Sequence, residues 1–168
     1  PTNINPPDRA AVVAVQSADE MLEAVMSSIR DADIFIGVAA VADYKPVSVE
    51  NQKIKKSGGS ALTLDLVQNQ DILKTVANLE NRPFTVGFAA ETENVIENAR
   101  TKLTAKNLDM IIANNVADTS IGFNSDHNET TIITRTITGT TEAQQPKMSK
   151  ENLSRKLIEL IAEQTTET

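Results

Sequence analysis

The residues of this chain best suited to chemistry lie between Ala39 and Lys56. Two small residues, Ala39 and Ala40, follow an apolar run, and a carboxylate, Asp43, comes shortly after them. A polar stretch then carries three lysines, which are Lys53, Lys55 and Lys56. Small residues leave room for a ligand close to the backbone, and lysines neutralise negative charge. The pattern predicts a site that handles an anion.

Two other apolar runs end in residues of the same kind. Ala89, Ala90 and Glu91 follow one run, and Asn114 with Asn115 follows another. If the runs are parallel strands, their carboxyl ends meet at one edge of a sheet, where ligands gather. The carboxylate or amide would supply a hydrogen-bond partner or a magnesium ligand. Small residues at such positions also allow helices to pack closely on a sheet, but their occurrence at three strand ends favours a site.

Several kinds of chemistry lack the residues that they need. The sequence contains neither the G-x-G-x-x-G pattern of dinucleotide binding nor the G-x-x-x-x-G-K-[ST] pattern of a phosphate loop. It has no cysteine, and its one histidine, His127, stands in a polar stretch, so zinc binding and nucleophilic catalysis are disfavoured. What remains is electrostatic stabilisation of a transferring phosphoryl or nucleotidyl group by lysines and a divalent ion.

Length and composition limit the class of protein. The 168 residues suit a single domain spanning 1–168, and no run of about 18 apolar residues could span a bilayer. The net charge of −7 argues against a general nucleic-acid binder. The lysines would then serve a small anionic ligand, although a solvated lysine face is the alternative. The absence of cysteine and of a signal peptide predicts a cytoplasmic protein.

Periodicity predicts the elements that must position these residues. Apolar or alternating runs predict strands at residues 12–15, 34–38, 62–67, 84–88 and 110–114. Spacing of three to four between apolar residues, with capping residues before them, predicts helices at 17–31, 71–79, 91–106 and 149–164. Residues 1–10 are predicted as a linker and 45–60 as a loop. Strands that alternate with helices predict an α/β fold, a doubly wound, Rossmann-like, mostly parallel sheet with helices on both faces.

The pattern changes near the end of the chain. Residues 130–138 are rich in β-branched side chains, and Gly139 follows as a turn. We therefore predict an antiparallel β-hairpin extension over 121–145, which needs a partner because isolated ribbons are marginally stable. The final helix would pack on the sheet through Leu153, Leu157, Ile158 and Ile161.

Five ordered motifs resemble bacterial phosphopantothenoylcysteine synthetase, usually the C-terminal half of a bifunctional coenzyme A biosynthesis flavoprotein (phosphopantothenoylcysteine decarboxylase/phosphopantothenate–cysteine ligase). The motifs are Ala39-Ala40-Val41-Ala42-Asp43-Tyr44, Lys53-Ile54-Lys55-Lys56, Gly87-Phe88-Ala89-Ala90-Glu91-Thr92, Ala113-Asn114-Asn115-Val116 and Phe123-Asn124-Ser125-Asp126. The resemblance covers nearly all of the chain, and the order of the motifs makes it specific.

The resemblance implies ligation of cysteine to 4′-phosphopantothenate with CTP, through an acyl-cytidylate, in coenzyme A biosynthesis. It implies that Lys53 is catalytic and that Ala39 and Ala40 line the acyl-cytidylate site, with Asn114 also binding substrate. The implied CTP-binding positions are Asp43, Lys53, Asn69, Gln70, Asp71, Ile72, Leu73, Phe88, Lys102 and Lys106. Asp43 and Glu91 would also take part in binding Mg²⁺.

The resemblance also implies a homodimer bridged by the ribbon at 130–138, and FMN only if a decarboxylase half exists outside this chain. The chain departs from the family at Gln70, where proline is usual, and at Asn115, where aspartate is usual. The family's Gly-rich N-terminal segment is absent before Pro1, so we expect a truncated chain, and both an active ligase and a fragment that is inactive alone stay open.

Two other functions remain open. One is a non-catalytic CTP-binding and dimerisation fragment of the same enzyme, acting as a nucleotide-sensing module. The other is a flavin or nicotinamide oxidoreductase, which lacks its phosphate-binding loop.

Overall fold

The computed structural model describes residues 5–50, 52–55, 61–117 and 125–166. The chain divides into a first unit, Pro1–Ser28 with Ala40–Asp71, and a second unit, Ile29–Ala39 with Ile72–Thr168. The single domain predicted for 1–168 stays a prediction. Lys56 and the motif residues Phe123 and Asn124 lie outside the described residues.

The second unit is built on a five-stranded sheet in the order β1-β4-β5-β6-β7. The strands are β1 (Ile34–Gly37), β4 (Phe84–Glu91), β5 (Met110–Asn115), β6 (His127–Thr136) and β7 (Gly139–Ser149). The β1-β4 and β4-β5 pairs are parallel, whereas the β5-β6 and β6-β7 pairs are antiparallel. The predicted α/β fold is confirmed.

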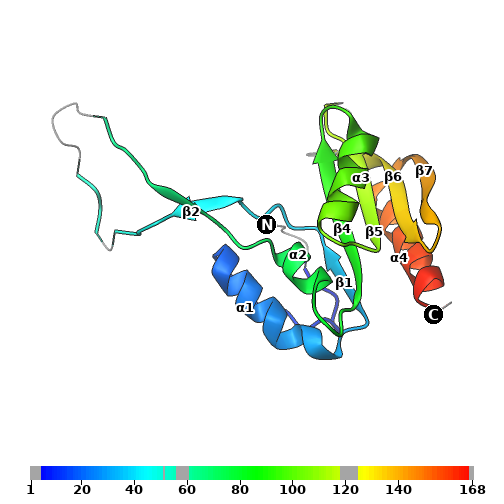
Figure 1. Ribbon diagram of the computed structural model, residues 1–168, viewed down its shortest axis with the longest axis horizontal. Helices are drawn as coiled ribbons and strands as arrows, with labels where there is room; N and C mark the ends of the chain where they lie inside the picture. Colours follow the sequence, from blue (N-terminus) through cyan, green and yellow to red (C-terminus); the bar gives the residue numbers. More distant parts are fainter. Residues whose placement is uncertain (1–4, 51, 56–60, 118–124, 167–168) are drawn as a thin grey trace. The chain divides into compact units, whose positions relative to one another are not determined.

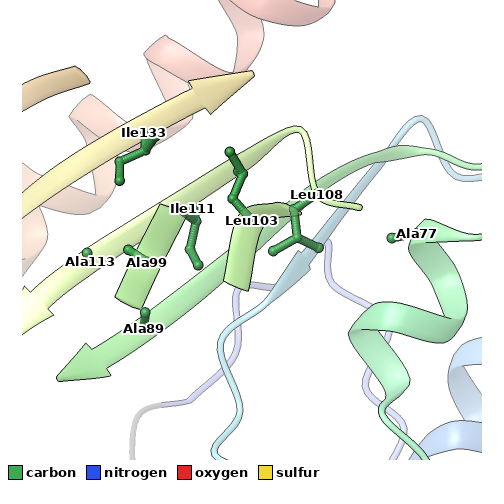
Figure 2. Close-up of a cluster of buried hydrophobic side chains, with 8 residues drawn as sticks. All are labelled: Ala77, Ala89, Ala99, Leu103, Leu108, Ile111, Ala113 and Ile133. Atoms are coloured by element: carbon green, nitrogen blue, oxygen red, sulfur yellow. The ribbon is translucent and has the colours of Figure 1, made fainter. Parts of the chain in front are cut away.

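Helices cover both faces of this sheet, as predicted (Figure 1). Helices α2 (Ile72–Ala77) and α3 (Val95–Ala105) pack with Ile111 and Ala113 on one face (Figure 2). Helix α4 (Lys150–Thr166) packs with Met110 and Ile112 on the other. Because neighbouring residues of a strand point to opposite faces, β5 is buried on both sides. Its continuous apolar sequence reflects that position.

Two glycines make room for α2 on the sheet. Gly37 and Gly87 lie opposite each other in the parallel β1-β4 pair. A Cβ atom on Gly87 would come within 2.8 Å of Leu108 and 2.9 Å of Leu73, and one on Gly37 within 3.1 Å of Leu73. The glycines therefore let Leu73 sit directly on the strands.

Strand β4 is longer than predicted. Its ladder with β5 continues to the Glu91–Asn115 pair, so Ala89, Ala90 and Glu91 belong to the strand instead of following it. For the same reason α3 begins at Val95, not at Glu91. Strand β1 is an edge strand of the sheet, and Ile34 and Ile36 are each 37% exposed.

The predicted antiparallel hairpin is present, but the predicted bounds, 121–145, are wrong. It runs from His127 to Ser149, and β6 pairs with β5, so the ribbon continues the main sheet instead of extending from it. Residues 121–124 of the predicted range lie outside the described residues. Ser149 caps α4 as expected, accepting a hydrogen bond from the Asn152 N–H at 3.2 Å. Ile158, predicted to be packed, is 56% exposed.

The first unit contains helix α1 (Ala18–Ser28) and a two-stranded antiparallel sheet of β2 (Tyr44–Pro46) and β3 (Leu66–Gln68). The predicted capping at Ser17 is confirmed, because its Oγ accepts from the Glu20 N–H at 3.2 Å. A 3₁₀ turn, Ile29–Asp31, follows α1 in sequence.

Two strand predictions in the first unit fail. Residues 12–15 form no strand, and Val12 and Val13 are each 65% exposed. The strand predicted at 62–67 is reduced to β3, whose partner β2 begins within the motif at Tyr44 and continues into the predicted loop. Among the described residues no helix is long and apolar enough to cross a membrane.

Candidate functional site

The carboxyl ends of β4 and β5 lie side by side in the second unit. Ala90 is opposite Asn114, and Glu91 is opposite Asn115. The structure thus brings together two of the three strand ends that the sequence singled out. Strand β1 runs parallel to β4, with its last residue, Gly37, opposite Gly87.

The predicted residues at these ends divide between the two faces of the sheet. Phe88 is half-buried against the cluster under α4, and it lies opposite Ile112 of the same cluster. Asn114, two residues beyond Ile112 on β5, shares that face. Glu91 lies on the opposite face, where α3 packs. A ligand at this edge could contact both sets, because the edge is common to both faces.

Glu91 is the centre of a polar network with α3. Its Oε1 atom accepts from Lys102 Nζ at 2.5 Å, and its Oε2 atom accepts from Asn98 Nδ2 at 3.3 Å. Its backbone carbonyl accepts from the Val116 N–H at 2.9 Å. The side chain of Glu91 is 13% exposed and that of Lys102 is 45% exposed. The Lys102 side chain is therefore accessible to solvent, while the Glu91 side chain is largely enclosed.

The two predicted CTP-binding lysines, Lys102 in α3 and Lys106 at its C-cap, lie one helical turn apart. The Lys106 N–H donates to the Lys102 carbonyl at 3.0 Å at the end of the helix. Residues four apart share a helical face, so both side chains leave α3 on the same side. Their predicted role in binding CTP stays a prediction.

In the first unit, Asn69 joins two of the predicted motifs. Its N–H donates to the Asp43 carbonyl at 2.8 Å, and its Nδ2 atom donates to the Ala42 carbonyl at 2.8 Å. Its Oδ1 atom is buried, and it is one of two buried side-chain atoms without a partner in the part of the chain that the structure describes. Asn69 thus fixes the backbone that carries Asp43.

The remaining predicted positions differ in exposure. Ala39, Ala40, Asp43, Lys53 and Gln70 are exposed, and Asp71 is half-buried. Lys53 lies in the described segment 52–55 between β2 and β3. Ile72 is only 7% exposed, and Leu73 contacts Gly37 and Gly87. The side chains of Ile72 and Leu73 pack in the core. These two residues could therefore contact a nucleotide only through their backbone atoms.

The magnesium site predicted from Asp43 and Glu91 stays a prediction. The described residues contain no group of three or more His, Cys, Asp or Glu side chains that could hold a metal ion. Both carboxylate oxygens of Glu91 already accept hydrogen bonds, one of them from an ammonium group. Asp43 is exposed. Magnesium in proteins is often held by one or two carboxylates together with the phosphates of the substrate, so a complete set of protein ligands is not required.

A second polar network lies at the opposite ends of the strands. Both terminal nitrogens of Arg82 donate to the Asp109 carboxylate at 2.6 Å, and the Thr85 N–H and Oγ1 donate to it at 2.7 and 2.9 Å. Burial alone would raise the pKa of Asp109, but these hydrogen bonds and the positive charge of Arg82 hold that pKa below its ordinary value of 3.8. The network fixes the starts of β4 and β5, away from the candidate site.

Sequence reasoning missed Asn98 and the Arg82–Asp109 pair. Asn98 stands four residues before Lys102, a spacing that places both side chains on one face of a helix. That spacing could have identified Asn98 as a neighbour of Lys102. No local signal identifies the Arg82–Asp109 pair, because 27 residues separate its members.

The fold and the polar strand ends define a doubly wound α/β protein, in which the carboxyl edge of the sheet is the candidate ligand site. A family model described as "DFP: DNA/pantothenate metabolism flavoprotein C-terminal domain" matches residues 1–165. The chain belongs to this family, which confirms the resemblance found in the sequence.

Curated relatives carry the name coenzyme A biosynthesis bifunctional protein CoaBC. The protein of Vibrio cholerae is 47% identical and is matched over 98% of this chain and 41% of its own length. That of Bacillus subtilis is 40% identical, over 97% of this chain and 39% of its own length. The chain therefore spans about two fifths of the length of these relatives.

Solved structures show the same fold. The C-terminal domain of a coenzyme A biosynthesis bifunctional protein CoaBC superposes with a TM-score of 0.77 at 33% identity, covering all of this chain and 74% of that one. The DNA/pantothenate metabolism flavoprotein of Streptococcus pneumoniae gives a TM-score of 0.71 at 20% identity, covering 94% of this chain and 75% of that one. The second similarity concerns the fold alone.

Proposed function

We propose that this chain performs the ligase reaction of coenzyme A biosynthesis, in which CTP activates 4′-phosphopantothenate for reaction with cysteine. The match of residues 1–165 to the family carries this proposal, because bifunctional coenzyme A biosynthesis proteins match over the same part of the chain. The candidate site supports it, since its amides, carboxylates and lysines suit the binding and charge neutralisation of a nucleotide.

The reaction has two steps. A carboxylate oxygen of 4′-phosphopantothenate attacks the α-phosphorus of CTP, and the bond to the β-phosphate breaks, which releases pyrophosphate and leaves an acyl-cytidylate. The amine of cysteine then attacks the acyl carbon, CMP leaves with the electron pair of the broken bond, and the amine loses a proton to give the amide. Charge neutralisation dominates the first step, because negative charge is transferred to pyrophosphate.

Each predicted residue has a role in this scheme. Lys53, exposed between β2 and β3, would contact the phosphates once the nucleotide is bound. Ala39 and Ala40 would line the acyl-cytidylate site, and Asn114 would bind substrate. Asp43, positioned through Asn69, would contact the nucleotide.

The other predicted positions would supply further nucleotide contacts. Phe88 would offer its ring to the nucleotide, while Lys102 and Lys106 would bind phosphate oxygens. Gln70 and Asp71 would also contact CTP, together with the backbone of Ile72 and Leu73.

We also propose that the whole protein carries a fused decarboxylase part and forms a homodimer. The relatives are named bifunctional, and this chain covers about two fifths of their length, which supports a second activity on the remaining part. We assign a flavin-dependent decarboxylase, and hence FMN, to that part. Strand β7 is an edge strand with residues 139–144 exposed, and we propose that the ribbon it forms with β6 pairs two copies of the chain.

Thermal melting with nucleotides tests the proposed specificity. A ligand that binds only the folded state raises the melting temperature as its concentration exceeds its dissociation constant. CTP with magnesium should stabilise the chain more than ATP at the same concentration. Equal stabilisation by the two nucleotides, or none by CTP, would refute the proposal. Formation of phosphopantothenoylcysteine would exclude the alternative of a non-catalytic CTP-binding fragment.

A further inference from the structure

The role of Glu91 is a question that the family match leaves open. Its carboxylate lies at the carboxyl end of β4, is 13% exposed and carries no hydrogen of its own when ionised. The structure gives both of its oxygens partners on α3, Lys102 on Oε1 and Asn98 on Oε2. We infer that Glu91 is a positioning residue, which holds the ammonium group of Lys102 in place for a triphosphate. This inference rests on the proposed function and deepens it.

The ammonium group of Lys102 has more hydrogens than Glu91 uses. A lysine ammonium has three hydrogens on a flexible four-carbon stem, and Glu91 accepts one of them at 2.5 Å. The side chain of Lys102 remains 45% exposed, and its bond to Glu91 uses only one of the three ammonium hydrogens. An anion can therefore bind Lys102 without displacing Glu91.

Asn98 fixes the carboxylate in turn. Its Nδ2 atom donates to Glu91 Oε2 at 3.3 Å and to the Glu93 carbonyl at 2.9 Å. The Val116 N–H holds the backbone carbonyl of Glu91 at 2.9 Å. The anchor thus belongs to the sheet, whereas the lysine that it holds belongs to a helix. A side chain ordered before binding loses less conformational freedom when the ligand arrives.

Two competing roles of Glu91 make different predictions. As a magnesium ligand, Glu91 would have to give up Lys102, and its removal would matter only when magnesium is present. As a charge that merely offsets Lys102, it would repel phosphate, and its removal would tighten anion binding. As a positioning residue, it strengthens binding with or without the metal. Loss of the acceptor would then weaken binding, and glutamine, which keeps an oxygen at the same place, would restore part of it.

Calorimetric titration of the full 168-residue chain with inorganic tripolyphosphate, without metal, tests the inference. Relative to wild type, Glu91→Ala should weaken binding about tenfold and Glu91→Gln by less, because one charge-assisted hydrogen bond orients the lysine. Glu93→Ala is the matched control, since it removes a nearby exposed carboxylate without touching Lys102, and it should leave binding unchanged or slightly stronger. Circular dichroism identifies variants that fail to fold, and Asn98→Ala provides a second, weaker disruption of the same anchor.

A double-mutant cycle separates positioning from general damage. Glu91→Ala should have no further effect on binding in a Lys102→Ala background, because the residue acts only through that lysine. Additive effects, tighter binding by Glu91→Ala, or an effect that appears only with magnesium would each overturn the inference, as would a wild type that does not bind tripolyphosphate.

A parallel titration with CTP and ATP distinguishes this inference from the proposed function. Tripolyphosphate binding that depends on Glu91 through Lys102, with no preference for CTP over ATP, would refute the proposed function and leave the positioning role. Preference for CTP over ATP, together with additive effects of Glu91→Ala and Lys102→Ala, would support the proposed function and refute the positioning role.

Discussion

Asp109 is the residue whose ionisation should govern acid stability. Its folded-state pKa lies below the ordinary value of 3.8 despite burial, because Arg82 and Thr85 bind the charged form. A group with a depressed pKa stabilises the fold above its ordinary pKa, and this stabilisation disappears as the pH falls through the folded-state value. Part of the free energy of unfolding should therefore be lost below about pH 3.8.

Asp109→Asn tests this role. At pH 7 the variant should lose about 3 kcal/mol of unfolding free energy in urea denaturation, because Arg82 keeps its charge without its partner. Its stability should also fall less steeply than that of wild type as the pH drops below 3.8. Asp31→Asn, at an exposed carboxylate, serves as the control. Parallel pH profiles for wild type and Asp109→Asn would contradict the assignment.

Gly87 is required by close packing and not by backbone conformation. Gly87→Ala should cost about 1–3 kcal/mol, because its Cβ atom would lie 2.8 Å from Leu108 and 2.9 Å from Leu73. Gly37→Ala, on the neighbouring strand, should cost less, since its nearest contact would be 3.1 Å. Urea denaturation measures both variants. A larger loss for Gly37→Ala than for Gly87→Ala would show that the packing of Leu73 is not the cause.

Residue types indicated much of the candidate site, but not its contacts. The alanine, asparagine and glutamate residues at the ends of β4 and β5 were predicted to be neighbours, because parallel strands place their ends together. The contacts of Asn69 with Ala42 and Asp43 were not predicted, since they join residues 26 or more apart. Ile72 and Leu73 fit the nucleotide motif by sequence, yet only the structure shows that their side chains are buried or packed.

At the scale of elements, the end of α3 depends on Asn107, the residue that reverses the chain into β5. Asn107 has a positive φ of 59°, and the Leu108 N–H donates back to the Leu103 carbonyl at 2.9 Å, as in a Schellman motif. Its Nδ2 atom also donates to the Ala77 carbonyl in α2 at 3.0 Å. One side chain thus ends α3 and links it to α2.

Substitutions at Asn107 separate these two contributions. Asn107→Ala should lose about 2 kcal/mol, from the left-handed backbone and from the missing hydrogen bond together. Asn107→Gly should lose about half of that, because glycine accepts the positive φ and lacks only the hydrogen bond. Equilibrium unfolding measures both. If the glycine variant were the less stable of the two, backbone strain would not be the deciding factor.

Elements with strong local signals were predicted well. Helices α1 and α4 have a serine cap followed by apolar residues at helical spacing, and both caps are present. Short apolar runs were less reliable: residues 12–15 form no strand, whereas β2 was not expected as a strand. A short strand exists only where a partner pairs with it, and pairing between distant segments is not encoded locally.

At the scale of the whole molecule, the proposed dimer makes Ile137 a residue of interest. Ile137 lies in the turn between β6 and β7 and is fully exposed in the single chain. If the ribbon pairs two copies, Ile137→Asp should weaken the dimer by placing a charge in an apolar contact. Light scattering after size-exclusion chromatography at several concentrations measures this. A wild type that stays monomeric at every concentration, or a variant that dimerises equally well, would contradict the proposal.

The order of the motifs predicted the family, and the match over residues 1–165 confirmed it. The division into two units was not predicted, because nothing in the composition marks a boundary near Ala40 or Asp71. The predicted site residues are spread over several motifs, and no single motif accounts for the reaction. A direct test must therefore measure the products.

The most direct test of the central claim follows the fate of CTP. The chain is incubated with 4′-phosphopantothenate labelled with ¹⁸O in its carboxylate, cysteine, CTP and magnesium, and the products are analysed by mass spectrometry. Our account predicts equal amounts of phosphopantothenoylcysteine, CMP and pyrophosphate, with one ¹⁸O atom in each CMP. Lys53→Ala should suppress all three products. Release of CDP and phosphate, CMP without the label, or intact CTP with no amide product would contradict the account.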